Sequence, residues 1–243
     1  MRGGLPLRKS DSKWFLTRVK QTIYHNGMIE AGDTVVAGFS GGKDSCALLY
    51  MLKLFQKHAP FRFELIAVHV DLGRPLDRGA LLRLADTFAV PLHIEKTPIY
   101  RIVFERRREK NPCALCANLR RGALHQAALR LGAGKVALGH HLDDAIQTYL
   151  MNLIFTGRME TFKPVTFLDR TGLTQIRPLV QIPEKTISAL ARREGWPVIK
   201  SACPISGRTK RQEMADLVEE LASRYPDLRE KWRNALLHGP WLL

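Results

Sequence analysis

The sequence predicts an α/β protein built on a doubly wound, mostly parallel five-stranded sheet with helices on both faces. Short apolar runs rich in β-branched residues alternate with amphipathic helical patterns, and short connections join them. One connection is a glycine-rich turn that leads from a strand directly into a helix. Repeated strand–helix–strand units of this kind make right-handed crossovers and parallel strands. The expected strands are Thr34–Gly38, Phe63–Val70, Leu92–Glu95, Lys135–Gly139 and Ile176–Val180.

The segments between these strands predict helices, because their apolar residues recur at three- and four-residue spacing. In the first of them, Ala47, Leu48 and Met51 share one face. The segment Tyr100–Lys110 is compatible with either a helix or a loop. The expected helices are Cys46–Phe55, Asp77–Phe88, Cys116–Leu131, Ile146–Phe155 and Pro183–Glu194.

This pattern divides the chain into three parts. Residues 1–30 are expected to form an N-terminal helical brace, with an amphipathic helix over Lys13–Met28. Residues 31–205 hold the sheet and are expected to form the ligand-binding domain. Residues 206–243 are expected to form a C-terminal helical extension.

The turn after the first strand has the composition of a phosphate-binding loop. Two glycines let the backbone turn sharply and expose N–H groups, and the following helix directs its N-terminal N–H groups and dipole at the same point. Two serines add hydroxyls, Lys43 adds a mobile cation, and Asp44 adds a carboxylate suited to Mg²⁺. Lys43 and Asp44 are therefore catalytic candidates in a nucleotide site. The six residues of this loop are Ser40, Gly41, Gly42, Lys43, Asp44 and Ser45.

This loop differs from the Walker loop, Gly-x₄-Gly-Lys-Ser/Thr, and from the Gly-x-Gly-x-x-Gly dinucleotide turn. Two glycines alone would favour an ordinary serine-capped turn of an α/β protein. The complete six-residue pattern, placed between a strand and a helix, favours nucleotide binding.

Other polar residues follow the second and fourth strands at the carboxyl edge of the sheet, where doubly wound proteins bind ligands. Asp71 is placed to meet a ribose hydroxyl or a metal ion, or simply to close a turn. Gly139 and His140 are candidates for ATP binding, His140 as a group that orients a phosphate. Asp143 is a candidate Mg²⁺ ligand or proton carrier. Helix capping by Asp143 or Asp144 is the alternative. A functional role is favoured for Asp143 and His140, and the role of Asp144 is left open.

The chain is strongly basic, with 38 Lys and Arg against 23 Asp and Glu, a net charge of +15. Such a surplus is typical of proteins that bind polyanions, because neutralised phosphates release counterions. A solvated helix end is the alternative for any single run of charges. The candidate contacts to a nucleic-acid backbone are Arg106, Arg107, Arg108, Lys110, Arg120 and Arg121.

No apolar run is long enough to cross a bilayer, and the N-terminus lacks the apolar stretch of a secretory signal. A cytoplasmic protein without a membrane partner is therefore expected.

The cysteines predict a metal site. Cys113 and Cys116 form a C-x-x-C pair, which zinc, dithiol and iron–sulfur sites all use. Cys203 is a distant third thiol, and Cys46 lies within a helix where packing is the better interpretation. Three thiolates suit a [4Fe–4S] cluster with one iron left open. Zinc with a histidine as its fourth ligand is the alternative.

In combination, these motifs resemble those of the tRNA 2-thiocytidine synthetase family, TtcA, in the PP-loop ATP pyrophosphatase superfamily. The resemblance runs from about Trp14 to Tyr225. It rests on Ser40–Ser45, Cys113–Cys116 with Leu119–Gly122, Ala137–Asp144 with Gln147, Thr148 and Asn152, Arg177–Leu179, and Cys203 with Gly207.

The resemblance implies a PP-loop, HUP-like fold and an enzyme that uses ATP and Mg²⁺. It also implies a [4Fe–4S] cluster held by Cys113, Cys116 and Cys203, with Asp44 on the magnesium ion. The enzyme would adenylate the C2 oxygen of cytidine 32 in tRNA and replace it with sulfur, with release of AMP and pyrophosphate. The basic residues would then contact tRNA, and a homodimer is expected. The sulfur donor would be a partner such as a cysteine desulfurase, or free sulfide.

Some features depart from the family pattern, and three other functions have to be compared with it. The second cysteine that some family members carry near Cys203 is missing. The related 2-thiouridine synthetases have terminal zinc-finger cysteines, which this sequence lacks, and a lysine where Arg120 stands. A lysidine-synthetase-type ligase would activate the same pyrimidine carbon without a cluster. A non-catalytic RNA-binding protein would explain the charge but not the glycine-rich loop.

Overall fold

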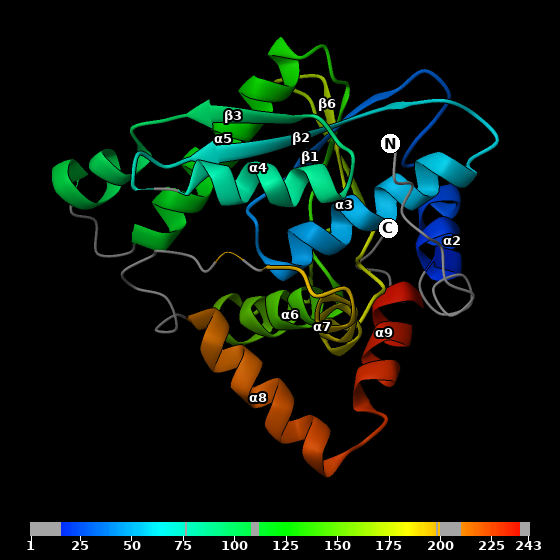
Figure 1. Ribbon diagram of the computed structural model, residues 1–243. Helices are drawn as coiled ribbons and strands as arrows, with labels where there is room; N and C mark the ends of the chain where they lie inside the picture. The colour runs from blue at the N-terminus through cyan, green and yellow to red at the C-terminus, as the bar shows by residue number, and fades with distance from the viewer. Residues whose placement is uncertain (1–15, 76, 108–111, 198, 200–209, 239–243) are drawn as a thin grey trace.

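The computed structural model describes residues 16–75, 77–107, 112–197, 199 and 210–238 (Figure 1). Its centre is a six-stranded sheet in the order β3-β2-β1-β4-β6-β5. Every neighbouring pair is parallel except β5 and β6, which form an antiparallel hairpin at one edge. The strands are β1 Thr34–Gly38, β2 Glu64–Asp71, β3 Leu92–Lys96, β4 Lys135–Ala137, β5 Val165–Leu168 and β6 Leu173–Ile176.

The predicted mostly parallel, doubly wound sheet is confirmed, but the predicted number of five strands is wrong. The fifth expected strand, Ile176–Val180, starts where β6 ends, because Pro178 cannot donate a ladder hydrogen bond. The edge strand β5 was not predicted. It has four residues, and Phe167 on it is 60% exposed, so it lacks the apolar run of a buried strand.

Helices cover both faces of the sheet, as predicted. Residues of α2, α3, α4 and α7 share the larger apolar core with one face, and α5 packs on the other. The segment Arg101–Arg107 is a π-helix, η2, packed against α5. The α-helices are α2 Thr17–His25, α3 Lys43–His58, α4 Arg78–Thr87, α5 Pro112–Arg130, α6 Leu142–Thr156, α7 Glu184–Arg193, α8 Lys210–Arg224 and α9 Leu228–His238.

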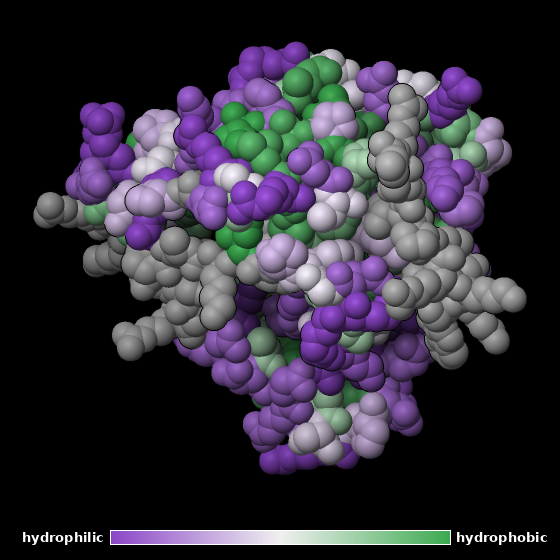
Figure 2. Space-filling view, in the orientation of Figure 1, coloured by the Kyte–Doolittle hydropathy of each residue, from purple (hydrophilic) through white to green (hydrophobic). Residues whose placement is uncertain are grey.

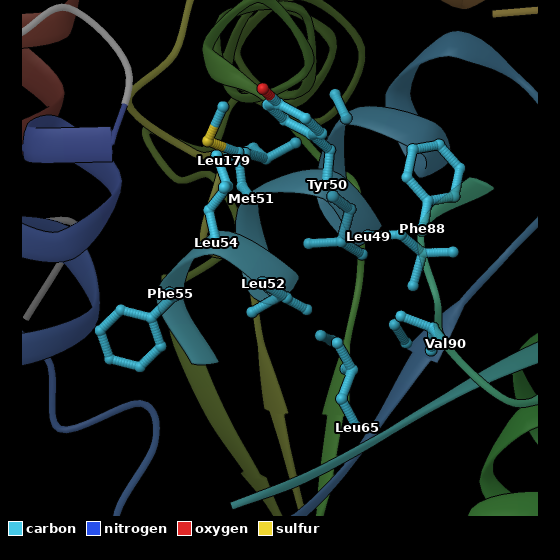
Figure 3. Packing of buried hydrophobic residues seen from close by; sticks show 14 of the residues in the cluster. Leu49, Tyr50, Met51, Leu52, Leu54, Phe55, Leu65, Phe88, Val90 and Leu179 are labelled. Carbon is cyan, nitrogen blue, oxygen red and sulfur yellow. The ribbon is translucent and has the colours of Figure 1, made fainter. Parts of the chain in front are cut away.

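The central helix α3 is apolar around its circumference because it lies between the sheet and α7. Its residues from Ser45 to Leu52 are all buried. In Figure 3, Leu49 and Leu52 lie on the side of α3 that faces Leu65 and Val90. Burying one such side chain contributes about 2 kcal/mol, so α3 is held firmly against the sheet.

The C-terminal helices α8 and α9 pack on α6 rather than on the sheet, and in Figure 1 they extend below α6 and α7. They contribute Met214, Val218 and Leu236 to a small third core. Their remaining surface is mostly hydrophilic, as the lower part of Figure 2 shows. None of the described helices combines the length and the apolarity that a bilayer crossing requires. The division at residues 30 and 205 stays a prediction.

The chain reverses its direction across the sheet next to β1. It proceeds from β1 to β2 and β3 on one side, then enters β4 on the other side of β1. The loops after β1 and β4 therefore leave the same carboxyl edge of the sheet, from neighbouring strands. Doubly wound proteins bind their ligands at this switch point.

Candidate active site

A cleft of about 470 Å³ opens at this switch point. The loops after β1 and β4 form part of its lining, the ends of β2 and β6 form another part, and α5 and Arg211 of α8 complete it. The lining includes Ser40, Asp44, Ser45, His69, Arg120, Arg121, Gly139, His140, Asp144, Gln175, Arg177 and Arg211. Seven of these residues, all except His69, Asp144, Gln175, Arg177 and Arg211, were predicted from the sequence as site residues.

The loop Ser40–Ser45 is shaped by its own hydrogen bonds. The Ser40 N–H donates to Ser45 Oγ at 3.2 Å, and Ser45 Oγ donates to the Gly42 carbonyl at 2.9 Å. Gly41 has a φ of +79°, which side chains rarely tolerate. The helix α3 starts at Lys43 with no side-chain cap on its first turn. Its N-terminal N–H groups are therefore available to an anion.

Lys43 lies in this loop but does not line the cleft. Its Nζ contacts Asp44 Oδ1 and Glu184 Oε1, each at 2.8 Å. Burial lowers the pKa of Lys43, but the two carboxylates outweigh burial and the net pKa is raised. The ammonium group is thus charged at neutral pH. Glu184, at the start of α7, was not predicted, because α7 comes to the loop from a distant part of the sequence.

The turn after β4 lies directly against the loop after β1. A Cβ on Gly139 would lie 3.1 Å from the Asp44 carbonyl oxygen, so only glycine allows this approach. His141 caps α6 in a reciprocal pair with Asp144. Its Nε2 lies 3.4 Å from Asp144 Oδ2 and 3.8 Å from Asp44 Oδ1. The turn thereby brings two cleft carboxylates close to one buried imidazole.

His140 is held as a neutral imidazole. Burial is the main cause that lowers its pKa to about 4; Asp144 opposes this shift, and the nearby Arg177 and Arg211 charges add to it. Arg177 Nε donates to His140 Nδ1 at 3.3 Å, which leaves the proton on Nε2. His140 can therefore donate a hydrogen bond without adding a charge to the cleft.

Two predicted carboxylates do not line the cleft. Asp143 Oδ2 accepts from the Glu184 N–H at 2.7 Å, and its Oδ1 accepts from Arg229 Nε at 2.9 Å. Asp71 accepts from the Gly73 N–H at 2.9 Å and from Arg78 at 3.2 Å, which is the turn-closing arrangement. The carboxylate that faces the cleft from the α6 turn is that of Asp144, whose role the sequence left open.

The helix α5 contributes thiols and arginines to the site. Ala117, Arg120, Arg121 and Leu124 line the cleft at the spacing of one helix face, and Cys113 belongs to the same row, one turn earlier. Cys113 and Cys116 are half-buried, three residues apart and hence neighbours on the helix surface.

This pair fits two positions of an iron–sulfur cluster, which takes thiolate ligands. Cys203 lies outside the described residues, and the residues that are described contain no group of three metal-ligating side chains. Cys46 lies in the core, where burial raises the pKa of its thiol to about 12, so it is a packing residue as predicted.

Two of the other predicted basic residues lie on η2, which packs against α5. Arg106 and Arg107 are exposed at the end of η2. Arg108 and Lys110 lie outside the described residues. Arg177, Arg211 and Gln175 were not predicted, although Arg177 follows β6 at the same carboxyl edge as the other site residues.

The loop, the sheet order and the cleft define a PP-loop protein. A family model described as a PP-loop domain matches residues 14–211. The tRNA-cytidine(32) 2-sulfurtransferase of Pelobacter propionicus is 40% identical over 222 residues, 90% of this chain and 82% of the relative. The protein of the same name from Geotalea uraniireducens is 38% identical over 224 residues, 90% of this chain and 88% of the relative.

A solved structure is also similar over most of its length. It is the U34-tRNA thiolase NcsA from Methanococcus maripaludis with its [4Fe-4S] cluster, with a TM-score of 0.78 and 25% identity, covering 97% of this chain and 83% of that one. The chain belongs to the tRNA-cytidine(32) 2-sulfurtransferase, or TtcA, family. The resemblance seen in the sequence is thereby confirmed.

Proposed function

We propose that the protein is an ATP-dependent tRNA thiolase that replaces the C2 oxygen of cytidine 32 in tRNA with sulfur. The observation that carries this proposal is the cleft itself. It brings the phosphate-binding loop Ser40–Ser45 together with the face of α5 that bears Arg120, Arg121 and the row of Cys113. The relationship to the TtcA family supports cytidine over other pyrimidines.

The first half of the reaction activates the base. The C2 oxygen attacks the α-phosphorus of ATP, the bond from that phosphorus to the β-phosphate breaks, and pyrophosphate leaves. The first N–H groups of α3 and the Lys43 ammonium stabilise the charge that develops on pyrophosphate. Lys43 exchanges its contacts with Asp44 and Glu184 for the phosphate oxygens.

Asp44 and Asp144 are the proposed magnesium ligands. Mg²⁺ prefers carboxylate oxygens together with substrate phosphates, and His141 lies close to both carboxylates. The Asp144 pKa is lowered: burial opposes ionisation, but His141, His140 and Arg211 favour it more strongly, so the carboxylate is ionised. Asp144 replaces Asp143 in this role, because Asp144 lines the cleft, whereas Asp143 does not and binds Glu184 and Arg229 instead.

In the second half a sulfur atom bonds to C2, the C2–O bond breaks and AMP leaves, so sulfide replaces oxide without a net change in redox state. Cys113, Cys116 and Cys203 are the residues that would hold a [4Fe–4S] cluster, which would carry the sulfur atom to be transferred. The Ile199 N–H donates to the Gly41 carbonyl at 2.9 Å, and Cys203 follows four residues later.

The tRNA is expected to approach over α5 and η2. Arg120 and Arg121 in the cleft and Arg106 and Arg107 at the end of η2 supply positive charge, and Arg108 and Lys110, which follow in the sequence, are proposed to add to it. A base in a single-stranded loop leaves its stack at small cost, so it can enter the cleft. We also propose a cytoplasmic enzyme that receives sulfur from sulfide or a cysteine desulfurase. We also expect a homodimer.

The test combines cluster content with product analysis. Anaerobically purified protein should be brown, with iron and acid-labile sulfide in similar amounts. A deletion strain should lack 2-thiocytidine in its tRNA nucleosides by mass spectrometry, and the intact gene should restore it. Cys113→Ala and Cys203→Ala should abolish both cluster and product, whereas Cys46→Ala, in the core, should retain both. A colourless, zinc-loaded protein, or a Cys203→Ala variant with full activity, would refute the proposal.

A further inference from the structure

Arg177 carries a buried positive charge at the floor of the cleft. The residue is 7% exposed and follows the last residue of β6. Its guanidinium donates from Nε to His140 and from Nη1 to the Lys163 carbonyl at 2.6 Å and to Thr166 Oγ1 at 3.3 Å. It also lies over the Phe162 ring, 4.8 Å from its centre. These contacts fix the orientation of the side chain.

None of these partner groups carries a negative charge. Within the described part of the chain, no carboxylate lies within ion-pairing distance of Arg177, and Nη2 has no hydrogen-bond partner. Burying a charge without a counterion is unfavourable. Burial and the Arg121 charge lower the Arg177 pKa to about 10, so the group is still charged at neutral pH. A folded protein that keeps such a charge at the floor of a ligand cleft is prepared for an anion.

The surroundings of Arg177 are also positive. Arg121 reaches the cleft from α5, and Arg211 reaches it from α8, where it pairs with Asp144 at 2.8 Å. His140, the direct neighbour, is neutral. The electrostatic potential on this side of the cleft therefore favours an anionic group next to Arg177.

The position of Arg177 separates it from the phosphate-binding loop. The loop follows β1, β4 pairs with β1, and β6 pairs with β4. Two strand spacings amount to about 10 Å. Arg177 therefore leaves the sheet edge two strands away from the loop Ser40–Ser45 that would hold the pyrophosphate.

We propose that Arg177 is a second phosphate-binding residue of the cleft, which contacts a phosphate other than the departing pyrophosphate. This inference rests on the proposed function, because that reaction brings two further phosphates into the cleft. One is the α-phosphate of ATP, and the other is the phosphodiester next to the target cytidine. Both present the oxygens that a guanidinium binds well.

Binding measurements on the holoenzyme distinguish these two sources. Arg177→Met removes the charge and keeps an apolar stem, and Arg177→Lys keeps a charge but loses the planar fork. Arg170→Met is the matched control, since Arg170 is exposed in the β5–β6 turn at the opposite end of the same hairpin. The probes are α,β-methylene-ATP, which resists cleavage, and unmodified tRNA titrated over a range of salt concentrations.

Arg177→Met should weaken binding of one or both probes at least about tenfold, as expected for a lost charged hydrogen bond. If the source is the phosphodiester, the slope of log K against log salt for tRNA should also decrease by about 0.7. If Arg177 contacts the α-phosphate of ATP, the variant should bind α,β-methylene-ATP more weakly than the wild type does. Arg170→Met should bind both probes like the wild type.

A folded Arg177→Met protein with wild-type affinity for both probes would overturn the inference. Should that variant not fold, Arg177→Lys decides instead: weaker binding of either probe supports the inference, and unchanged binding of both overturns it. The proposed function is tested separately, because 2-thiocytidine formation by the wild type does not depend on either result.

Discussion

Arg229 of α9 donates from Nε to the Asp143 carboxylate at 2.9 Å, and the other Asp143 oxygen accepts from the Glu184 N–H at 2.7 Å. One buried side chain thereby joins the C-terminal extension, the turn after β4 and the start of α7. Asp144, its neighbour in the sequence, pairs with Arg211 of α8. The C-terminal helices are thus attached to the same turn that carries His140 and Asp144 into the cleft.

Removal of Arg229 should therefore destabilise the protein. Arg229→Met leaves the Asp143 carboxylate, 6% exposed, without its cation, and we expect a loss of about 2 kcal/mol in the free energy of unfolding. Arg224→Met is the control, because the Arg224–Glu220 pair is exposed and should contribute less than about 1 kcal/mol. Urea denaturation measures both. Equal losses in the two variants would contradict the role assigned to Asp143.

Lys43 should matter for turnover much more than for folding. Lys43→Met removes the cation expected to stabilise pyrophosphate, and we expect kcat for tRNA thiolation to fall about 100-fold. The melting temperature should change little, since Lys43 is partly exposed. Lys185→Met removes an exposed charge from the neighbouring first turn of α7 and should leave kcat unchanged. If Lys43→Met retained wild-type turnover, the electrostatic role of the loop would be refuted.

The sequence was most informative where the signal is local. The loop Ser40–Ser45 is six consecutive residues between a strand and a helix, so its pattern alone places it at the sheet edge. Asp143 and Asp144 are also consecutive, but neighbouring residues of a helix point about 100° apart. Only the packing of α9 and α7 decides which carboxylate faces the cleft.

Residues that enter from distant elements could not be predicted in this way. Glu184 reaches Lys43 because α7 packs beside α3. Arg177 reaches His140 because β6 pairs with β4. The sequence predicted a strand over Ile176–Val180, which put Arg177 inside a strand instead of directly after one. The edge strand β5 escaped prediction because it is short and half-exposed, without the apolar run that marks the central strands.

Gly41 should tolerate no side chain, because both its backbone conformation and a neighbouring side chain oppose a Cβ. Its φ is +79°, and a Cβ would lie 2.9 Å from Ile199 Cδ1. Gly132 has a φ of +70° with nothing near its Cβ position. Gly132→Ala therefore measures backbone strain, about 1 kcal/mol, and Gly41→Ala adds a clash. We expect only Gly41→Ala to weaken ATP binding, measured by calorimetry. ATP binding by Gly41→Ala at the level of Gly132→Ala would show that the loop and Ile199 move apart freely.

His140 should make the folded protein sensitive to mild acid. Its pKa falls from 6.5 to about 4 on folding, mainly because the imidazole is buried. Between these two values the unfolded chain binds a proton that the folded chain does not, so stability present above pH 6.5 is lost as the pH falls toward 4. His140→Asn keeps an acceptor for Arg177 but cannot titrate. Urea denaturation at several pH values should therefore show a steeper decline for the wild type, by at most about 1.4 kcal/mol per pH unit. If stability declined equally with pH in the wild type and in His140→Asn, His140 would take up its proton inside the folded cleft. The positive charges of His140 and Arg177 would then lie side by side.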